Sequence, residues 1–166
     1  MVERGYGTSD GNPTEDGVYV DAEAAWDYLT AIPDIDSSRI GVFGRSIGSA
    51  VALHLATERP VQAVVLDSPL STGREMARRH YKFMPTMLTR LSLDNIGRAG
   101  QLTVPLLVFH GTDDWVATID MGRRVAEAGR AEEFVEIQGA GHNDTFTIGG
   151  DAYVTRFHEF LETHLR

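Results

Sequence analysis

Residues 40–48 read Ile40-Gly41-Val42-Phe43-Gly44-Arg45-Ser46-Ile47-Gly48, and Ser49-Ala50-Val51-Ala52-Leu53-His54-Leu55-Ala56 follows without a break. β-Branched and aromatic side chains precede the first flanking glycine, whereas small and apolar side chains at helical spacing follow the second. This order predicts a strand, a sharp turn and a helix. We expect Ser46 at the tip of the turn, with a glycine on each side because any side chain there would collide with neighbouring backbone.

The predicted turn gives Ser46 a reactive setting. It lifts the hydroxyl above the edge of the sheet. It also directs the first N–H groups of the helix, that of Ile47 above all, toward an oxygen that becomes negative when Ser46 attacks a carbonyl. A Gly-x-Ser-x-Gly pentapeptide also occurs by chance in unrelated chains. The strand before it and the helix after it therefore carry the interpretation.

Length and composition limit the number of domains and the classes of partner. With 166 residues the chain corresponds to a single domain, residues 1–166, which can bury about two thirds of its unfolded surface. It has no cysteine, and its net charge of -9 argues against nucleic acid as a partner. No apolar stretch is long enough to span a bilayer and the start lacks the apolar core of a signal peptide, so we expect a cytoplasmic protein without a transmembrane segment.

Strand and helix patterns alternate along the chain after a loop expected over residues 1–13. Continuous Val and Leu runs predict buried parallel strands, and apolar residues at helical spacing predict helices. The first expected strand begins at residue 40, and the others cover 61–66, 105–109 and 133–137. The expected helices cover 15–31, with Thr14 as N-cap, 49–56, 119–128 and 151–165. The fold class is therefore α/β, a parallel sheet with flanking helices and right-handed crossovers.

Three loops at the carboxyl ends of the predicted strands carry groups suited to nucleophilic catalysis. Ser46 follows the first strand, Asp114 the third and His142 the fourth. Such loops gather on one edge of a parallel sheet. A neutral imidazole can take the proton of a serine hydroxyl, and does so best when its other nitrogen donates to a carboxylate. The three side chains are therefore candidates for one catalytic site.

Other carboxylates could fill the place of the acid. Asp113 is next to Asp114, although adjacent residues cannot both face His142, and Asp67 ends the second strand, where an acid more often caps a turn. Asp113, Asp114, His142 and Asp144 could in principle hold a divalent metal. Neither histidine-rich helical spacing nor an EF-hand loop is present, so no metal site is predicted.

The remaining histidines are expected outside the site. His110 closes the third strand and is predicted to be a hydrogen-bonded turn residue. His54 lies on the helix after the Ser46 turn and is predicted to be structural. Three others stand in polar surroundings and are expected on the surface: His80, His158 and His164.

Three motifs resemble the nucleophile, acid and histidine loops of the α/β-hydrolase superfamily: Gly44-Arg45-Ser46-Ile47-Gly48, His110-Gly111-Thr112-Asp113-Asp114 and Gly139-Ala140-Gly141-His142-Asn143-Asp144. They stand in the family's order, and the likeness covers nearly the whole chain. Arg4-Gly5-Tyr6-Gly7-Thr8-Ser9 resembles the loop after the family's fourth strand. With Asp67-Ser68-Pro69-Leu70-Ser71, the likeness is greatest to the branch of membrane-associated protein depalmitoylases and their bacterial relatives. The resemblance implies Ser46 as nucleophile, His142 as general base and then acid, and Asp114 as the orienting carboxylate.

The chain departs from this family's pattern at its start. Family members have four strands before the loop that residues 4–9 resemble, and the turn after the third supplies half of the oxyanion hole. We therefore expect a truncated domain, the C-terminal portion of the fold, with the Ile47 N–H as an oxyanion donor and no second donor. Losing one donor costs about 3 kcal/mol. The first strand would then keep an uncovered apolar edge, through which a homodimer could form.

Residues 72–100 differ from the rest of the chain in charge. Six basic side chains stand against two acidic ones in this segment, with Met, Tyr, Phe and Leu residues interleaved. The segment could be a small basic cap over the site that contacts an acyl chain or an anionic headgroup. It could equally be an ordinary surface helix whose apolar side packs on the sheet. The sequence is compatible with both.

Two functions remain. The first is a serine acyl hydrolase, an esterase or thioesterase, in which Ser46 is acylated by a small-molecule ester or thioester and water then releases the acid. The second is a catalytically weak or inactive remnant that acts at most as a binding or dimerising domain. Ester, thioester and amide hydrolases share the same three residues, so the leaving group and acyl length stay open. Nothing in the sequence implies a cofactor.

Overall fold

Four parallel strands form the centre of the protein, for which the computed structural model describes residues 11–12, 14–80 and 92–166. The sheet has the order β1-β2-β3-β4, with all three pairings parallel. Its strands are β1 (Gly41–Arg45), β2 (Ala63–Asp67), β3 (Leu106–Gly111) and β4 (Glu133–Ile137). The α/β fold class is confirmed. Of the expected loop over residues 1–13, all but residues 11 and 12 lies outside the described residues, including the motif at residues 4–9.

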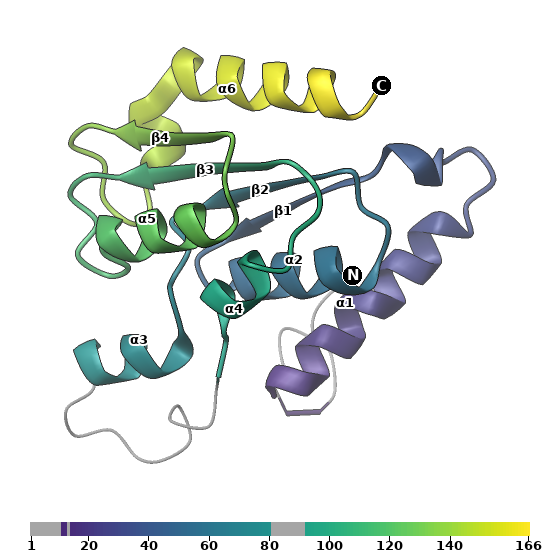
Figure 1. The fold of residues 1–166 in the computed structure, drawn as a ribbon, viewed down its shortest axis with the longest axis horizontal. Helices are drawn as coiled ribbons and strands as arrows, with labels where there is room; N and C mark the ends of the chain where they lie inside the picture. The colour runs from purple at the N-terminus through teal and green to yellow at the C-terminus, as the bar shows by residue number, and fades with distance from the viewer. Residues whose placement is uncertain (1–10, 13, 81–91) are drawn as a thin grey trace.

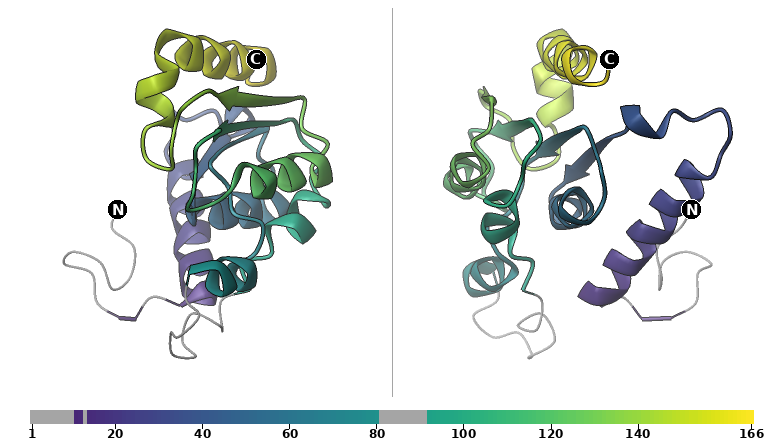
Figure 2. Two further views of the ribbon diagram at one scale, coloured as in Figure 1. Left: turned by 90° about the vertical axis from the view of Figure 1, so that its left-hand side faces the viewer. Right: turned by 45° about the vertical axis from the view of Figure 1, so that its right-hand side comes forward.

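Helices cover both faces of this sheet, and Figure 1 and Figure 2 show the resulting layers. One face carries α6 (Thr145–His164). The other carries α2 (Gly48–Glu58), α4 (Asn95–Ala99) and α5 (Ile119–Ala128), with α1 (Glu15–Thr30) packed beside α2. A 3-10 turn (Ser37–Arg39) leads into β1, and α3 (Gly73–His80) follows β2. No described helix has the length and apolar character needed to cross a membrane.

Local signals explain how α1 begins. The side-chain oxygen of Thr14 accepts a hydrogen bond from the Gly17 N–H at 3.1 Å, as expected of an N-cap. Glu15 and Asp16 then place negative charge in the first turn, where the helix dipole favours it. The helix ends at Thr30, one residue earlier than expected.

Alternation along the buried strands separates the core into two layers. Val64, Leu66 and Val108 pack with Leu53 of α2 on one face, whereas other strand residues pack with α6 on the opposite face. The residues of that second layer include Ala63, Val65, Leu107, Phe109, Tyr153 and Phe160. Every residue of β2 and β3 is buried, which is why these strands read as continuous apolar runs.

The register brings the carboxyl ends of the strands to one edge. Arg45 is opposite Asp67, Asp67 is opposite Phe109, and Gly111 is opposite Ile137. The loops that leave these ends therefore start side by side. This is the edge at which ligands bind in open α/β sheets.

The last helix differs from the expectation. It begins at Thr145 instead of residue 151 and contains a kink at Gly150, which has φ 50° and ψ -136°. Glycine weakens helices, and Gly149 and Gly150 stand in this early part of the helix. In the structure Gly150 takes up the bend, and the turn before it joins the helix to the histidine loop.

β1 forms one edge of the described sheet, and no described strand pairs with its outer side. The Phe43 side chain is 50% exposed there. Beside it lies a hollow of about 440 Å³, whose apolar lining includes Phe43, Phe146, Val154 and Phe157. The described part of the chain thus has the uncovered apolar edge that the sequence predicted.

Candidate active site

Ser46 occupies the turn between β1 and α2. Its φ is 52°, a left-handed conformation that is uncommon outside glycine, and its N–H donates to the Asp67 carbonyl at 2.9 Å. A Cβ at Gly44 would lie 2.5 Å from the Gly48 carbonyl oxygen, so the expected collision exists there. At Gly48 the same expectation is wrong, because a Cβ placed there would have no described atom within 4 Å beyond its chain neighbours and the backbone of its own helix.

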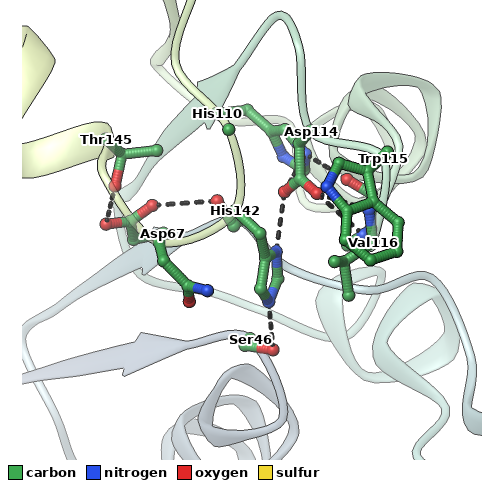
Figure 3. A network of polar contacts seen from close by, with 12 residues as sticks. Ser46, Asp67, His110, Asp114, Trp115, Val116, His142 and Thr145 are labelled. Carbon is green, nitrogen blue, oxygen red and sulfur yellow. Dashed lines mark hydrogen bonds and ion pairs between the residues drawn. The ribbon is translucent and has the colours of Figure 1, made fainter.

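The three predicted side chains meet above this turn, as Figure 3 shows. His142 Nε2 lies 2.8 Å from Ser46 Oγ, and His142 Nδ1 lies 2.7 Å from Asp114 Oδ2. A carboxylate only accepts hydrogen bonds, so Nδ1 carries the proton in this arrangement. Nε2 is then free to accept the proton of the Ser46 hydroxyl.

Asp114 is held from two sides. Its Oδ1 accepts the backbone N–H groups of Val116 and Ala117, each at 2.9 Å. Burial on its own would raise the pKa of Asp114, but contacts of the carboxylate with His110 and His142 outweigh burial and hold that pKa well below its ordinary value. The carboxylate is therefore ionised when His142 needs a negative partner.

Asp113 does not take part in this arrangement. Its side chain is exposed and accepts from Thr112 Oγ1 at 3.2 Å. Asp144 accepts the Gly141 N–H at 2.7 Å and so shapes the histidine loop. Within residues 11–12, 14–80 and 92–166, no group of three or more His, Asp or Glu side chains could hold a metal ion.

His110 is a neighbour of the acid that sequence reasoning missed as part of the site. It is fully buried, and its Nε2 lies 2.8 Å from the Ala117 carbonyl and 3.5 Å from Asp114 Oδ2. A carbonyl only accepts, so Nε2 carries a proton and faces the carboxylate. The His110-Gly111 pair before Asp114 is visible in the sequence, but only the fold of the loop places His110 against the Asp114 carboxylate.

Arg45 and Asp67 support the histidine loop from the adjoining strands. The Arg45 guanidinium donates to the His142 carbonyl and, at 2.9 Å, to Asn143 Oδ1. Asp67 is 2% exposed and accepts from Thr145 Oγ1 at 2.8 Å and from the Tyr153 hydroxyl at 3.2 Å. Asp67 thus anchors the start of α6 and does not face His142 as an alternative acid.

Two other histidines have clear partners. His54 is structural, as expected: its ring stacks on Tyr19 at 4.3 Å, and its Nε2 lies 2.9 Å from Glu23. His164 is less exposed than expected, because it pairs with Glu132 at 2.9 Å. His158 is exposed as predicted, and the side chain of His80 lies outside the described residues.

The basic segment is described only in part, since residues 81–91 fall outside. Met76 of α3 packs against a small buried cluster that contains Leu70, Ala117 and Met121. Arg79 Nε donates to the Trp115 carbonyl at 3.4 Å, beside the acid. The described part of the segment therefore packs as a surface helix and also touches the loop of Asp114.

Comparisons with known proteins agree with this fold. A family model described as the C-terminal part of BAAT and acyl-CoA thioester hydrolases matches residues 22–96. An uncharacterized protein of Mycobacterium tuberculosis is 40% identical over 162 residues, which are 95% of this chain and 57% of that protein. The human alpha/beta hydrolase domain-containing protein 17B is 36% identical over 97% of this chain and 54% of its own length. The chain spans a little over half the length of these relatives.

Solved structures share the architecture. An esterase of Pyrococcus furiosus superposes with a TM-score of 0.81 over 99% of this chain and 68% of that chain, at 20% identity. The esterase domain of a Rhodothermus marinus protein gives a TM-score of 0.69 over 89% of this chain and 69% of that chain, at 21% identity. At such identities the shared property is the fold.

Proposed function

The chain belongs to the α/β-hydrolase superfamily, and on that basis we propose that it is a serine acyl hydrolase that cleaves carboxylic esters or thioesters. The observation that supports this most directly is the short contact of 2.8 Å between Ser46 Oγ and His142 Nε2. A serine hydroxyl becomes an effective nucleophile when a neutral imidazole is within reach of its proton. The buried carboxylate of Asp114 on the other ring nitrogen favours that tautomer.

The proposed reaction has two halves. His142 Nε2 takes the proton of Ser46 as Oγ bonds to the substrate carbonyl carbon, and the carbonyl oxygen becomes an oxyanion beside the Ile47 N–H. The oxyanion collapses, the bond to the leaving oxygen or sulfur breaks, and the imidazolium returns its proton to that atom. Water then loses a proton to His142, attacks the acyl carbon and releases the acid, while Ser46 regains its proton.

The chemistry of the three residues and the description of the matching family support the proposed substrate class. An acyl ester or thioester supplies the carbonyl and leaving group that this mechanism requires, and every step uses only protein side chains, the backbone and water. The matching family is described by acyl-CoA thioester hydrolysis, which favours an acyl thioester as one substrate. We expect a small molecule to be the substrate and no cofactor to be needed.

A second candidate function is supported by the uncovered edge of β1. A strand edge with open backbone groups and an exposed Phe43 is a surface on which another chain can add a strand. On this proposal the chain is weakly active or inactive and pairs with a second copy through β1. Phe43→Lys, which places a charge on the edge, should then abolish the dimer mass measured by light scattering.

Hydrolysis of short and medium p-nitrophenyl esters and of acyl thioesters tests the first proposal. The chain has no cysteine, so a thiol reagent detects only the released thiol. Ser46→Ala is the control, because it removes the attacking oxygen and nothing else. Turnover that disappears in the variant supports the hydrolase. Equal rates in the two proteins, together with no covalent labelling of Ser46 by a fluorophosphonate, would leave the second candidate.

A further inference from the structure

A chain of buried hydrogen bonds runs from α4 to the turn of Ser46. The Asn95 side-chain nitrogen Nδ2 lies 2.7 Å from Ser49 Oγ, and Ser49 Oγ lies 2.5 Å from the Ser46 carbonyl oxygen. Asn95 and Ser49 are both fully buried. The helix that precedes β3 therefore contacts the backbone of the proposed nucleophile through one intervening hydroxyl.

The direction of these bonds is fixed by their partners. The same Asn95 Nδ2 lies 2.8 Å from the Leu70 carbonyl, which can only accept, so the atom facing it must be the amide nitrogen. Its two protons go to Leu70 and Ser49. Ser49 Oγ accepts one of them, and its own proton is left for the Ser46 carbonyl. Every bond in the chain is thus polarised toward Ser46.

Ser46 needs support of this kind. A left-handed conformation outside glycine persists where surrounding contacts determine it. The Ser46 N–H is held by the Asp67 carbonyl at 2.9 Å, and the Ser46 carbonyl also accepts the Ser49 N–H at 3.0 Å. The Ser49 hydroxyl adds a bond whose strength depends on Asn95, a residue 46 positions after Ser49 in the chain.

Packing alone does not account for an asparagine at position 95. Among the described residues its Oδ1 has no hydrogen-bond partner, and a buried carbonyl oxygen without a partner opposes folding. An apolar side chain of similar size would avoid that cost. What the amide provides is the pair of donor bonds, one to Leu70 and one to Ser49.

Asn95 lies within the basic segment of residues 72–100, at a neck where two parts of the chain meet. The chain leaves at Ser71 and returns at Asn95, and the backbone N–H of Asn95 donates to the Ser71 carbonyl at 3.2 Å. The Gly73 N–H donates to the Ser92 carbonyl at 2.9 Å just outside this neck. The residue that closes the neck is therefore the residue that supports the nucleophile turn.

We propose that Asn95 is a positioning residue for Ser46, which acts through the Ser49 hydroxyl to hold the nucleophile turn with Oγ facing His142. The part of this proposal that concerns catalysis rests on the proposed hydrolase function. The part that concerns the turn does not, because the conformation of Ser46 can be measured without turnover.

The kinetic test uses Asn95→Leu, Ser49→Ala and the double variant in the full chain, with ester hydrolysis as the readout. We expect each single variant to lower kcat about tenfold or more while KM stays within about twofold. The kcat of the double variant should lie within about twofold of that of Ser49→Ala, because both changes break the same series of hydrogen bonds. Ser71→Ala is the matched control: its buried hydroxyl bonds Glu75 at 2.5 Å in the same neck without touching Ser49, and kcat should be unchanged.

Amide hydrogen exchange of Ser46 supplies the readout that does not need activity. In Asn95→Leu and Ser49→Ala, protection of the Ser46 N–H should fall about tenfold while that of Val108 in β3 is unchanged. If Asn95→Leu does not fold, Ser49→Ala, which deletes a single oxygen, decides alone. Three results would overturn the proposal. They are wild-type protection of the Ser46 N–H in a folded variant, a loss of kcat in the double variant that equals the product of the two single losses, and a loss of kcat in Ser71→Ala as large as in Asn95→Leu. If the wild-type chain shows no turnover but Asn95→Leu still lowers the protection of Ser46, only the proposed hydrolase function is contradicted.

Discussion

The guanidinium of Arg45 donates a hydrogen bond to the backbone carbonyl of His142. The residue immediately before the proposed nucleophile therefore holds the backbone of the proposed base, so the distance between the two reacting groups is set partly by this contact. A charged donor to a carbonyl contributes about 1.5–3 kcal/mol when it is well formed.

Arg45→Met should therefore lower kcat. The methionine keeps part of the side-chain volume but loses the donors to His142 and Asn143, so the imidazole spends less time near Ser46. We expect a fall of about 10- to 100-fold in ester hydrolysis measured well below the melting temperature, which should itself fall by several degrees. Arg39→Met is the control, because Arg39 Nε also donates to a backbone carbonyl, that of Leu165 at 2.7 Å, in a different part of the molecule. Equal losses in both variants would contradict the role of Arg45.

The ionisation of Asp114 should make the free energy of unfolding depend on pH. Its pKa is lowered in the folded state, so the stabilisation from its ionised form is present above the ordinary Asp pKa of about 3.9 and is lost as the pH falls below that value toward the folded pKa. Asp114→Asn lacks a group that titrates there. Its free energy of unfolding in urea should fall less between about pH 6 and about pH 3 than that of the wild type.

Asp113→Asn is the matched control for this measurement, because Asp113 is adjacent in sequence and exposed. It should keep the wild-type loss of stability on acidification. Other carboxylates with lowered pKa also contribute to that loss in all three proteins: Glu23, Asp36 and Glu75. The prediction is therefore a difference between variants, and identical pH dependence in Asp114→Asn and Asp113→Asn would contradict it.

The two glycines beside Ser46 should respond differently to alanine. A Cβ at Gly44 would meet the Gly48 carbonyl at 2.5 Å and Ala52 Cβ at 2.6 Å, so Gly44→Ala should cost about 1–3 kcal/mol of stability. At Gly48 no described atom is in reach, and Gly48→Ala should be neutral or stabilising by up to about 1 kcal/mol. Urea denaturation of both variants checks this, and equal destabilisation would contradict the geometry.

Sequence reasoning recovered the features that depend on local pattern. The strand, turn and helix around Ser46 follow from residue order, and the loops of Asp114 and His142 follow from where apolar runs end. Because parallel strands place their carboxyl ends at one edge, these positions alone predicted that the three side chains would meet. The Thr14 cap was predicted for the same reason, since capping depends on residues within one turn.

The contacts that the sequence did not reveal join distant parts of the chain. Thr145 and Tyr153 bond Asp67 only because α6 crosses that end of β2, and Asn95 reaches Ser49 only because α4 packs beside α2. No periodicity marks such residues, because each is a single polar side chain whose partner is chosen by packing. Steric need at a glycine is equally a tertiary property, and the prediction was wrong at Gly48 for that reason.

The exposed arginines of α3 allow the two interpretations of the basic segment to be separated. Arg78 and Arg79 are exposed, and Arg79 contacts the Trp115 carbonyl next to Asp114. If the segment attracts an anionic acyl substrate, reversing both charges should lower kcat/KM for an acyl-CoA thioester about tenfold, and added salt should reduce the difference. Hydrolysis of a short neutral ester should be unchanged, because that substrate carries no charge for the helix to attract.

Arg156→Glu is the control for this charge reversal, because Arg156 is exposed on α6, away from α3. It changes the net charge in the same sense without altering the helix that touches the Asp114 loop. A selective loss in the α3 variant, absent from Arg156→Glu, identifies a local field at the site. Equal losses on the charged and neutral substrates would mean that α3 acts only by packing Met76 against its buried cluster, as an ordinary surface helix does.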